Sequence, residues 1–352
     1  MPSDRMLEYY YAMGQDARMR EDWDEAIFYF QKAAKLHVAE AAEELGAIGY
    51  LFETGRGVPC DLEKAASCYE ESAEAGNSEA AFHLGKLCMS EAGDRKPDYK
   101  KAKKYLERAS LSGIGEASWL LGRLYDEGML GHVNPKRAFR YFLLAAERGV
   151  GAAMLMVGLC YAQGSPVPKD LTAAELWIRK GHVAGEEDGA ATLRTFLTIA
   201  ATEYAGGGAG RLDDARAFSM ATEAEALGNT EAFLLLGETY RSKNKMPGHE
   251  EKAFRCFLRA DEKGSNDAKA ALGLCYESGL GTAPSIEKAV TCYLAAAEGG
   301  NAFAMARLGY AYETGEGIER NEKLAMQWLI RAALQGDKGA ILTLRDDYGY
   351  TV

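Results

Sequence analysis

The chain has 352 residues and a mass of 38.2 kDa, enough for two or three globular domains of ordinary size. Its 58 alanines against only nine valines and nine isoleucines exclude a protein built on several β-sheets and predict an almost entirely helical fold. The 52 acidic and 41 basic residues give a net charge of −11, which argues against a broad nucleic-acid surface, and no apolar run reaches the roughly 20 residues of a membrane span.

The first 41 residues are expected to form a helix pair. Residues 1–15 are polar and tyrosine-rich and lack the apolar core of a secretory signal, so we expect a cytoplasmic protein without a membrane segment. The segment Asp22–Ala33 resembles the second half of a tetratricopeptide repeat, with Gly14, Ala26 and Phe30 at the small and aromatic positions of that family. Residues 1–41 are therefore predicted to be an N-terminal tetratricopeptide-like helix pair.

A repeat of about 36 residues follows. Two independent columns of small residues share the spacings 37, 36, 36, 43, 36, 36 and 36. Two residue types that keep one register over eight units indicate a repeat architecture. The first column is Ala65, Ala102, Ala138, Ala174, Ala217, Ala253, Ala289 and Ala325, and the second is Gly76, Gly113, Gly149, Gly185, Gly228, Gly264, Gly300 and Gly336.

Each repeat is predicted to contain two helices. In the third repeat, Ala117, Leu121 and Tyr125 share one helix face at i, i+4 and i+8, and Ala138 and Phe142 do the same in the second helix. The changes in repeat length fall in the loop between the two helices, because the other spacings are constant. A third column, on the first helix, is Gly49, Gly85, Gly122, Gly158, Arg194, Gly237, Gly273 and Gly309.

The second helices carry start and stop signals. Four residues before the alanine column, seven of eight positions hold a short side-chain oxygen that suits an N-cap, and His249 is the exception. The column that begins with Gly76 suits the left-handed position that ends a helix. The expected N-caps are Asp61, Asp98, Asn134, Asp170, Asp213, Ser285 and Asn321.

These elements predict an all-α protein, an α/α solenoid of about 19 helices in which antiparallel helix pairs stack into a right-handed superhelix. Residues 340–352 are expected to form a C-terminal capping helix. The eight repeats lie within residues 42–340 and span about 42–79, 80–116, 117–152, 153–188, 189–231 with a glycine-rich loop insertion, 232–267, 268–303 and 304–339.

The motifs A-x-x-x-L-G-x-x-Y-x-x-G-x-G-V, K-A-x-x-x-Y and A-x-x-G-N recur through these repeats. The clearest copies are Leu272–Gly281 with Lys288–Tyr293, and Leu308–Ile318 with Lys323–Ala325. Over residues 42–340 the chain therefore resembles Sel-1-like repeat proteins of the tetratricopeptide superfamily. The resemblance implies a scaffold or adaptor for protein complexes, often in bacterial signalling or host-associated settings. Some secreted members carry paired cysteines in each repeat, and this sequence lacks those pairs.

A solenoid of this type presents the first helix of each repeat on its concave face. If Leu121 and Tyr125 are core residues, the positions two before and two after Leu121 should point into that groove. These positions are rich in large apolar and aromatic residues, which either anchor a bound peptide or pack against neighbouring repeats. The candidate groove residues are Tyr11, Tyr50, Phe82, Lys86, Trp119, Arg123, Leu155, Leu159, Leu234, Glu238, Leu274 and Tyr310.

Two further features concern the loops inside the repeats. Residues 206–211 (G-G-G-A-G-R) lack the context of a phosphate-binding loop, so we expect a flexible tether that divides the array into two arms. Basic residues gather along one expected edge, where a solvated edge explains them and an acidic partner or phosphate ligand is the alternative. They are Arg95, Lys96, Lys100, Lys101, Lys103, Lys104, Arg241, Lys243 and Lys245.

The sequence offers little chemistry. The seven cysteines lack a C-x-x-C pair and are expected to be reduced thiols in the core, and the five histidines have no metal-ligand spacing, so no metal or cofactor is expected. Ser242 and Ser285 each begin a Ser-x-x-Lys sequence without the other β-lactamase motifs. We expect a non-enzymatic scaffold whose partner is a protein or peptide and not a small molecule. The alternative is a hydrolase or other enzyme or regulator with a site on the repeat loops.

Overall fold

The computed structural model describes residues 4–91, 96–208, 212–243 and 247–350, and these residues form nineteen α-helices and no strand. The helices are α1 (Asp4–Met19), α2 (Trp23–Ala34), α3 (Ala39–Thr54), α4 (Leu62–Glu74), α5 (Ser78–Met89), α6 (Tyr99–Leu111), α7 (Gly115–Asp126), α8 (Pro135–Glu147), α9 (Gly151–Gln163), α10 (Leu171–Val183), α11 (Gly189–Gly206), α12 (Asp214–Ala226), α13 (Ala232–Ser242), α14 (His249–Glu262), α15 (Asn266–Ser278), α16 (Ile286–Glu298), α17 (Ala302–Thr314), α18 (Glu322–Leu334) and α19 (Lys338–Asp346).

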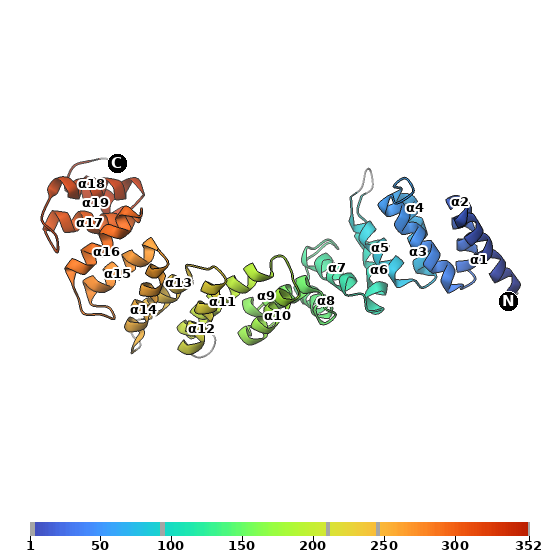
Figure 1. Ribbon diagram of the computed structural model, residues 1–352, viewed down its shortest axis with the longest axis horizontal. Helices are drawn as coiled ribbons and strands as arrows, with labels where there is room; N and C mark the ends of the chain where they lie inside the picture. The colour runs from blue at the N-terminus through green and yellow to red at the C-terminus, as the bar shows by residue number, and fades with distance from the viewer. Residues whose placement is uncertain (1–3, 92–95, 209–211, 244–246, 351–352) are drawn as a thin grey trace. The chain divides into compact units, whose positions relative to one another are not determined.

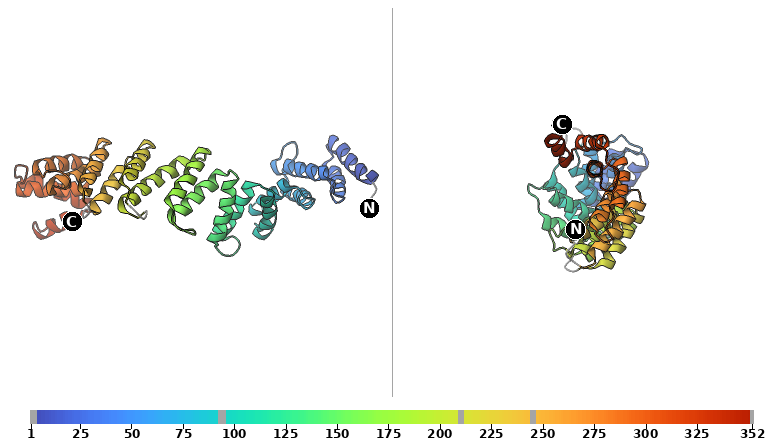
Figure 2. Two further views of the ribbon diagram at one scale, coloured as in Figure 1. Left: turned by 90° about the horizontal axis from the view of Figure 1, so that it is seen from below. Right: turned by 90° about the vertical axis from the view of Figure 1, so that its left-hand side faces the viewer.

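The chain forms two compact units, Met1–Gly189 and Ala190–Val352. Within each unit, most helices that follow one another in the sequence pack side by side, first within a repeat (α3 on α4, α17 on α18) and then between repeats (α4 on α5, α16 on α17), as Figures 1 and 2 show. Contacts thus join mainly nearest neighbours, as in an α/α solenoid. The predicted fold class and helix number are confirmed.

The division into units does not fall where we expected it. We placed it at the glycine-rich loop, whereas the two units separate between Gly189 and Ala190, at the beginning of α11. Gly206 is the last residue of α11, inside the second unit, and residues 209–211 lie outside the described part of the chain.

The glycine column on the first helices explains how the two helices of a repeat pack closely. A Cβ at Gly85 would lie 2.6 Å from Leu106 Cγ, and a Cβ at Gly237 would lie 2.6 Å from Phe257 Cε1. Glycine therefore leaves the notch into which a large side chain of the second helix inserts. These inserted residues form a column of their own, Tyr69, Leu106, Phe142, Ile178, Phe257, Tyr293 and Leu329.

In the fifth repeat, the large residue lies on the first helix and the small residue on the second. Arg194 stands where the other repeats have glycine, and Ala221 stands where they have the large inserted side chain. Ala221 is fully buried, and Arg194 Nη1 lies 3.5 Å from the Leu227 carbonyl oxygen, at the C-terminal end of α12. A cation suits this end of a helix, because carbonyl groups are left without intrahelical partners there.

The predicted helix signals are confirmed. All seven expected N-cap side chains accept a backbone N–H bond from the first turn of the following helix, as Asp98 does from Lys101 N at 2.9 Å. His249 is the first residue of α14, whose N-cap is Gly248. All eight glycines of the Gly76 column have positive φ, between 81° and 108°, and each ends a second helix.

Candidate functional site

The first helices of successive repeats in unit 1, α3, α5, α7 and α9, form a surface that we call the first-helix face. Three of the predicted aromatic residues lie on it, Tyr50 on α3, Phe82 on α5 and Trp119 on α7. Tyr50 is exposed, with 38% of its surface accessible, and Phe82 and Trp119 are half-buried. Trp119 also contacts the inserted Phe142 ring, with the ring centroids 5.1 Å apart.

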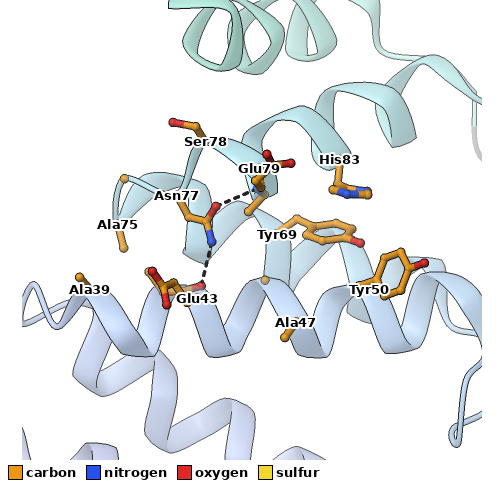
Figure 3. A pocket seen from close by; sticks show the side chains of 14 residues that line it. Ala39, Glu43, Ala47, Tyr50, Tyr69, Ala75, Asn77, Ser78, Glu79 and His83 are labelled. Atoms are coloured by element: carbon orange, nitrogen blue, oxygen red, sulfur yellow. Dashed lines mark hydrogen bonds between the residues drawn. The ribbon is translucent and has the colours of Figure 1, made fainter. Parts of the chain in front are cut away.

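A hollow of about 720 Å³ lies between α3 and α5 on this face (Figure 3). We call it the α3–α5 hollow. Its volume lies within the range of about 300–1,000 Å³ that is usual for ligand sites. It is lined by Ala39, Ala42, Glu43, Gly46, Ala47, Tyr50, Tyr69, Ala75, Gly76, Asn77, Ser78, Glu79, Ala80 and His83.

One end of the hollow is aromatic. The His83 ring stacks on Tyr69, with centroids 5.2 Å apart and planes at 16°, and meets the Tyr50 ring edge-on at 5.9 Å. Glu53 holds this arrangement, because its Oε2 accepts a hydrogen bond of 2.6 Å from the Tyr69 hydroxyl and lies 3.2 Å from His83 Nδ1. Burial first, and then the bond to Glu53, raise the pKa of Tyr69, which keeps the hydroxyl a neutral donor.

The floor of the hollow is built by small residues and buried hydrogen bonds. The Ser72 hydroxyl donates to the Ala42 carbonyl oxygen at 2.5 Å, and Asn77 Nδ2 donates to the same oxygen at 3.4 Å. A Cβ at Gly46 would lie 3.1 Å from Asn77 Nδ2 and 3.2 Å from Ser72 Oγ. Glycine at this position therefore lets the second helix of the repeat, α4, and the loop after it bind the backbone of the first helix, α3.

Two carboxylates lie in the hollow, Glu43 on α3 and Glu79 on α5 (Figure 3). Both residues are exposed, and neither has an ion pair or side-chain hydrogen bond within the described residues. The fourteen lining residues include no lysine or arginine. The hollow thus combines small apolar side chains, aromatic rings and negative charge.

The other predicted residues of unit 1 differ in exposure. Leu155 is only 7% exposed and packs against Gly181 of α10, so it is a core residue and does not line an open surface. Tyr11 is half-buried against Phe30, and Leu159 is half-buried. Lys86 is exposed, and the Arg123 guanidinium donates to Glu127 on its own helix at 2.7 Å.

The predicted residues of unit 2 are all half-buried, and they lie on α13, α15 and α17. Glu238 pairs with Arg241 of the same helix, with 2.5 Å between Oε2 and Nη2. The Tyr310 hydroxyl lies 2.9 Å from Thr343 Oγ1 of α19, and its side chain borders a hollow of about 190 Å³. Leu234 and Leu274 lie on the first helices of the sixth and seventh repeats.

Sequence reasoning missed Glu43, Glu53, Tyr69, Glu79 and His83. One signal could have found two of them. Six residues before the glycine of the first helix, the first three repeats carry an acid: Glu43, Glu79 and Glu116. The other residues become neighbours only through packing between helices, which no spacing in the sequence shows.

The predicted basic edge is largely neutralised. Lys101 lies 2.8 Å from Glu70, Lys104 lies 3.0 Å from Glu74, and all three lysines from 101 to 104 belong to α6 and not to a loop. Lys103 pairs with Glu107 at 3.6 Å, and Lys96, Lys100 and Lys243 are exposed. Arg95 and Lys245 lie outside the described residues.

The seven cysteines are free thiols. Burial raises the pKa of Cys68 and of Cys256 to about 12, so both behave as small apolar residues and not as nucleophiles. Among the described residues, no group of three or more His, Cys, Asp or Glu side chains could hold a metal ion. None of the helices described is long and apolar enough to span a bilayer.

Tandem helix pairs with a glycine notch, a capped second helix and a left-handed glycine define an α/α repeat protein of the tetratricopeptide type. The chain belongs to the Sel1 repeat family, whose model matches residues 9–38, 39–77, 78–114, 115–150, 151–181, 266–301 and 302–337. The first of these matches covers the helix pair that resembled a tetratricopeptide repeat. Proteins of this family are generally scaffolds for protein interactions.

Two curated relatives illustrate the range of the family. The chain is 32% identical over 181 residues to "DAP3-binding cell death enhancer 1" of Rattus norvegicus, covering 51% of this chain and 35% of that protein. It is 30% identical over 149 residues to "Chitin synthase regulatory factor 1" of Schizosaccharomyces pombe, covering 42% of this chain and 32% of that one. The chain thus spans about a third of the length of these relatives.

Two solved structures are also similar. The protective antigen c5321 of uropathogenic Escherichia coli, described as an SLR fold, is 26% identical with a TM-score of 0.48, covering 92% of this chain and 67% of that one. A Sel1 repeat protein of Oxalobacter formigenes is 21% identical with a TM-score of 0.43, covering 97% of this chain and 85% of that one.

Proposed function

We propose that the chain is a non-enzymatic scaffold that binds a segment of another protein on the first-helix face of unit 1. One observation carries the proposal: Tyr50, Phe82 and Trp119 keep accessible surface on three successive first helices, and Tyr50 also lines the α3–α5 hollow. Large, partly accessible aromatic side chains around a concavity are the usual anchors of protein interfaces.

The core of the repeats is already filled by other residues. The alanine column and the inserted column are almost completely buried, as Ala102 and Leu106 are. The helix pairs therefore close without the Tyr50 ring and with only part of the Phe82 surface. Aromatic side chains that keep accessible surface on three successive first helices support a binding role for the face that carries them.

The relatives support the same role. The name of the rat protein assigns it binding to DAP3, and the fission yeast protein is named as a regulatory factor. We propose complex assembly in the cytoplasm as the role of this chain as well, and bacterial signalling as its setting. The four buried cysteines, Cys68, Cys88, Cys256 and Cys275, support a reducing compartment, whereas Cys60 is exposed and does not lie in the core as we expected.

The alternative of a hydrolase draws no support from the two Ser-x-x-Lys sequences. The Ser242 hydroxyl donates to the Thr239 carbonyl oxygen at 2.8 Å. The Ser285 hydroxyl donates to Glu287 at 2.9 Å and accepts from Lys288 N as the N-cap of α16. Both hydroxyls serve the ends of helices, so we do not propose an enzymatic function.

The test is affinity capture with the purified chain and extract of the native cell, quantified by mass spectrometry. Trp119→Ala and Phe82→Ala should each lose the captured partner, with a drop in affinity of about 2 kcal/mol, or about thirtyfold. Leu111→Ala is the matched control, because Leu111 is an 87% exposed apolar residue on the second helix α6. Circular dichroism checks that each variant keeps its helices. Equal capture by the wild type and both aromatic variants would refute the proposal.

A further inference from the structure

We infer that the α3–α5 hollow receives a lysine or arginine side chain of the bound polypeptide, so that the partner of this face is a basic segment. The inference rests on the proposed function and adds the chemistry of the partner to it. Three properties of the hollow point to this occupant: its charge, its aromatic walls and the apolar lining between them.

The charge of the hollow is negative from both sides. Glu43 comes from α3 and Glu79 from α5, and both carboxylates are exposed without a partner among the described residues. The helix dipole explains the presence of an unpaired carboxylate at Glu79, because an acid in the first turn of α5 is stabilised there. It does not account for Glu43, which is the fifth residue of α3. A cationic side chain between the two helices would complement both carboxylates.

The aromatic end provides a second attraction for a cation. Tyr50 is exposed and His83 is half-buried, so both present ring surface, whereas Tyr69 is buried behind His83. A cation over a tyrosine ring gains about 0.5–1 kcal/mol at an exposed site. The Tyr50 ring already carries one such contact within the chain, because the Arg56 guanidinium carbon lies 5.7 Å from its centroid. The Glu53 carboxylate behind Tyr69 and His83 adds to the negative field at this end.

The lining between the two ends suits the stem of a long basic side chain. Ala39, Ala42, Gly46, Ala47 and Ala80 leave an apolar channel without bulky side chains. Lysine and arginine bury their methylene stems on such surfaces while the charged head stays at polar groups. An acidic segment would instead meet Glu43 and Glu79 without any lysine or arginine to offset them.

The acids continue beyond the hollow. Glu116 occupies the same position on α7 as Glu79 does on α5, is exposed and has no ion pair in the described part of the chain. A bound segment that crosses successive first helices would therefore meet one carboxylate per repeat from α3 to α7. This predicts several basic residues in the partner, with the one in the hollow contributing most.

The inference can be tested without knowing the natural partner. The full chain is immobilised, and a phage-displayed library of random twelve-residue peptides is selected against it. Lysine and arginine should be enriched among the selected peptides, and the enrichment should disappear when the selection is repeated on the Glu43→Gln, Glu79→Gln double variant. If no peptide is selected, the proposed function fails as well. If peptides are selected but are not basic, only the inference on the hollow fails.

Affinities of one selected peptide then locate the contact. The double variant should bind it about tenfold more weakly at low salt, and the loss should shrink as salt screens the charges. The control is Glu63→Gln with Glu147→Gln, which makes the same charge change at exposed positions on the second helices α4 and α8. Ala47→Trp, an exposed substitution that fills the hollow, should abolish binding while helicity is kept. Equal affinity of the wild type and these hollow variants would overturn the inference.

Discussion

Replacement of Gly237 by alanine tests the packing that defines each repeat. In an isolated helix, alanine is favoured over glycine by about 1 kcal/mol, so helix propensity alone predicts a more stable protein. The structure predicts the opposite. A Cβ at Gly237 would lie 2.6 Å from Phe257 Cε1, 2.8 Å from Phe257 Cδ1 and 3.1 Å from Cys256 Cβ.

The magnitude follows from how little room the neighbours have. Ordinary contacts of a Cβ with an aromatic carbon begin near 3.4 Å, so the ring or the helix must move by almost 1 Å. Phe257 and Cys256 are fully buried, and α14 must therefore shift away from α13. Overpacking of this kind costs about 1–3 kcal/mol, which outweighs the propensity gain and leaves Gly237→Ala up to about 2 kcal/mol less stable.

The assay is urea unfolding followed by circular dichroism, with hydrogen exchange to localise the change to α13 and α14. Gly206→Ala is the matched control in the same unit, because a Cβ there would meet only Thr239 Cγ2 at 3.6 Å, and it should stabilise slightly. Phe257→Leu should restore part of the stability of Gly237→Ala, as a double-mutant cycle would show. Stabilisation by Gly237→Ala, equal to that by Gly206→Ala, would refute the notch.

Three further outcomes are expected. Leu155→Ala should lower the free energy of unfolding by about 2–5 kcal/mol, measured by urea unfolding, because Leu155 is buried. Burial alone would raise the pKa of Asp214, but hydrogen bonds from Lys252 Nζ and the Tyr240 hydroxyl lower it overall. The ionised carboxylate therefore stabilises the fold above about pH 4, and this stabilisation is lost as pH falls further. The stability gap between the wild type and Asp214→Asn should therefore narrow between pH 7 and pH 3, and a constant gap would contradict this. His249→Leu should raise the urea midpoint by the equivalent of about 1 kcal/mol, because it removes the buried, unpaired Nδ1.

The fold could be predicted because its determinants repeat. Glycine at a helix end and a polar N-cap act within a few residues, so their spacing in the sequence already states their structural role. The Gly237 notch and the inserted Phe257 are farther apart, yet they keep the same separation in most repeats. Seven copies of this notch make it visible from the sequence alone. Arg194 departs from the glycine column in the sequence. In the structure the small, buried Ala221 on the second helix compensates for it, because no large side chain has to insert there.

The site could be predicted only in outline, because its residues meet across helices. Choosing the residues two before and two after the Leu121 position of each repeat predicted Tyr50, Phe82 and Trp119, and also Leu155. Leu155 is buried, because Gly181 of α10 leaves room for its side chain. That glycine breaks a column which is alanine in six of the other seven repeats, such as Ala145, and serine in the first, at Ser72. Whether a given side chain points outward thus depends on the size of a residue on another helix, which one periodic position does not reveal.

The hollow itself lies where the first repeat lacks a large side chain on its first helix. At the position equivalent to Gly46, the next two repeats have Phe82 and Trp119. The sequence alone therefore suggests that the first repeat contributes no side chain to a partner at this position. In the structure this glycine lets Ser72 and Asn77 of the same repeat reach the Ala42 carbonyl oxygen, and it leaves the space beside them open. A side chain at Gly46 would occupy the space in which a partner's side chain is expected. If the proposed binding role holds, Gly46 is therefore the most informative position on the first-helix face of unit 1, because there we expect the partner to supply the side chain that this chain omits.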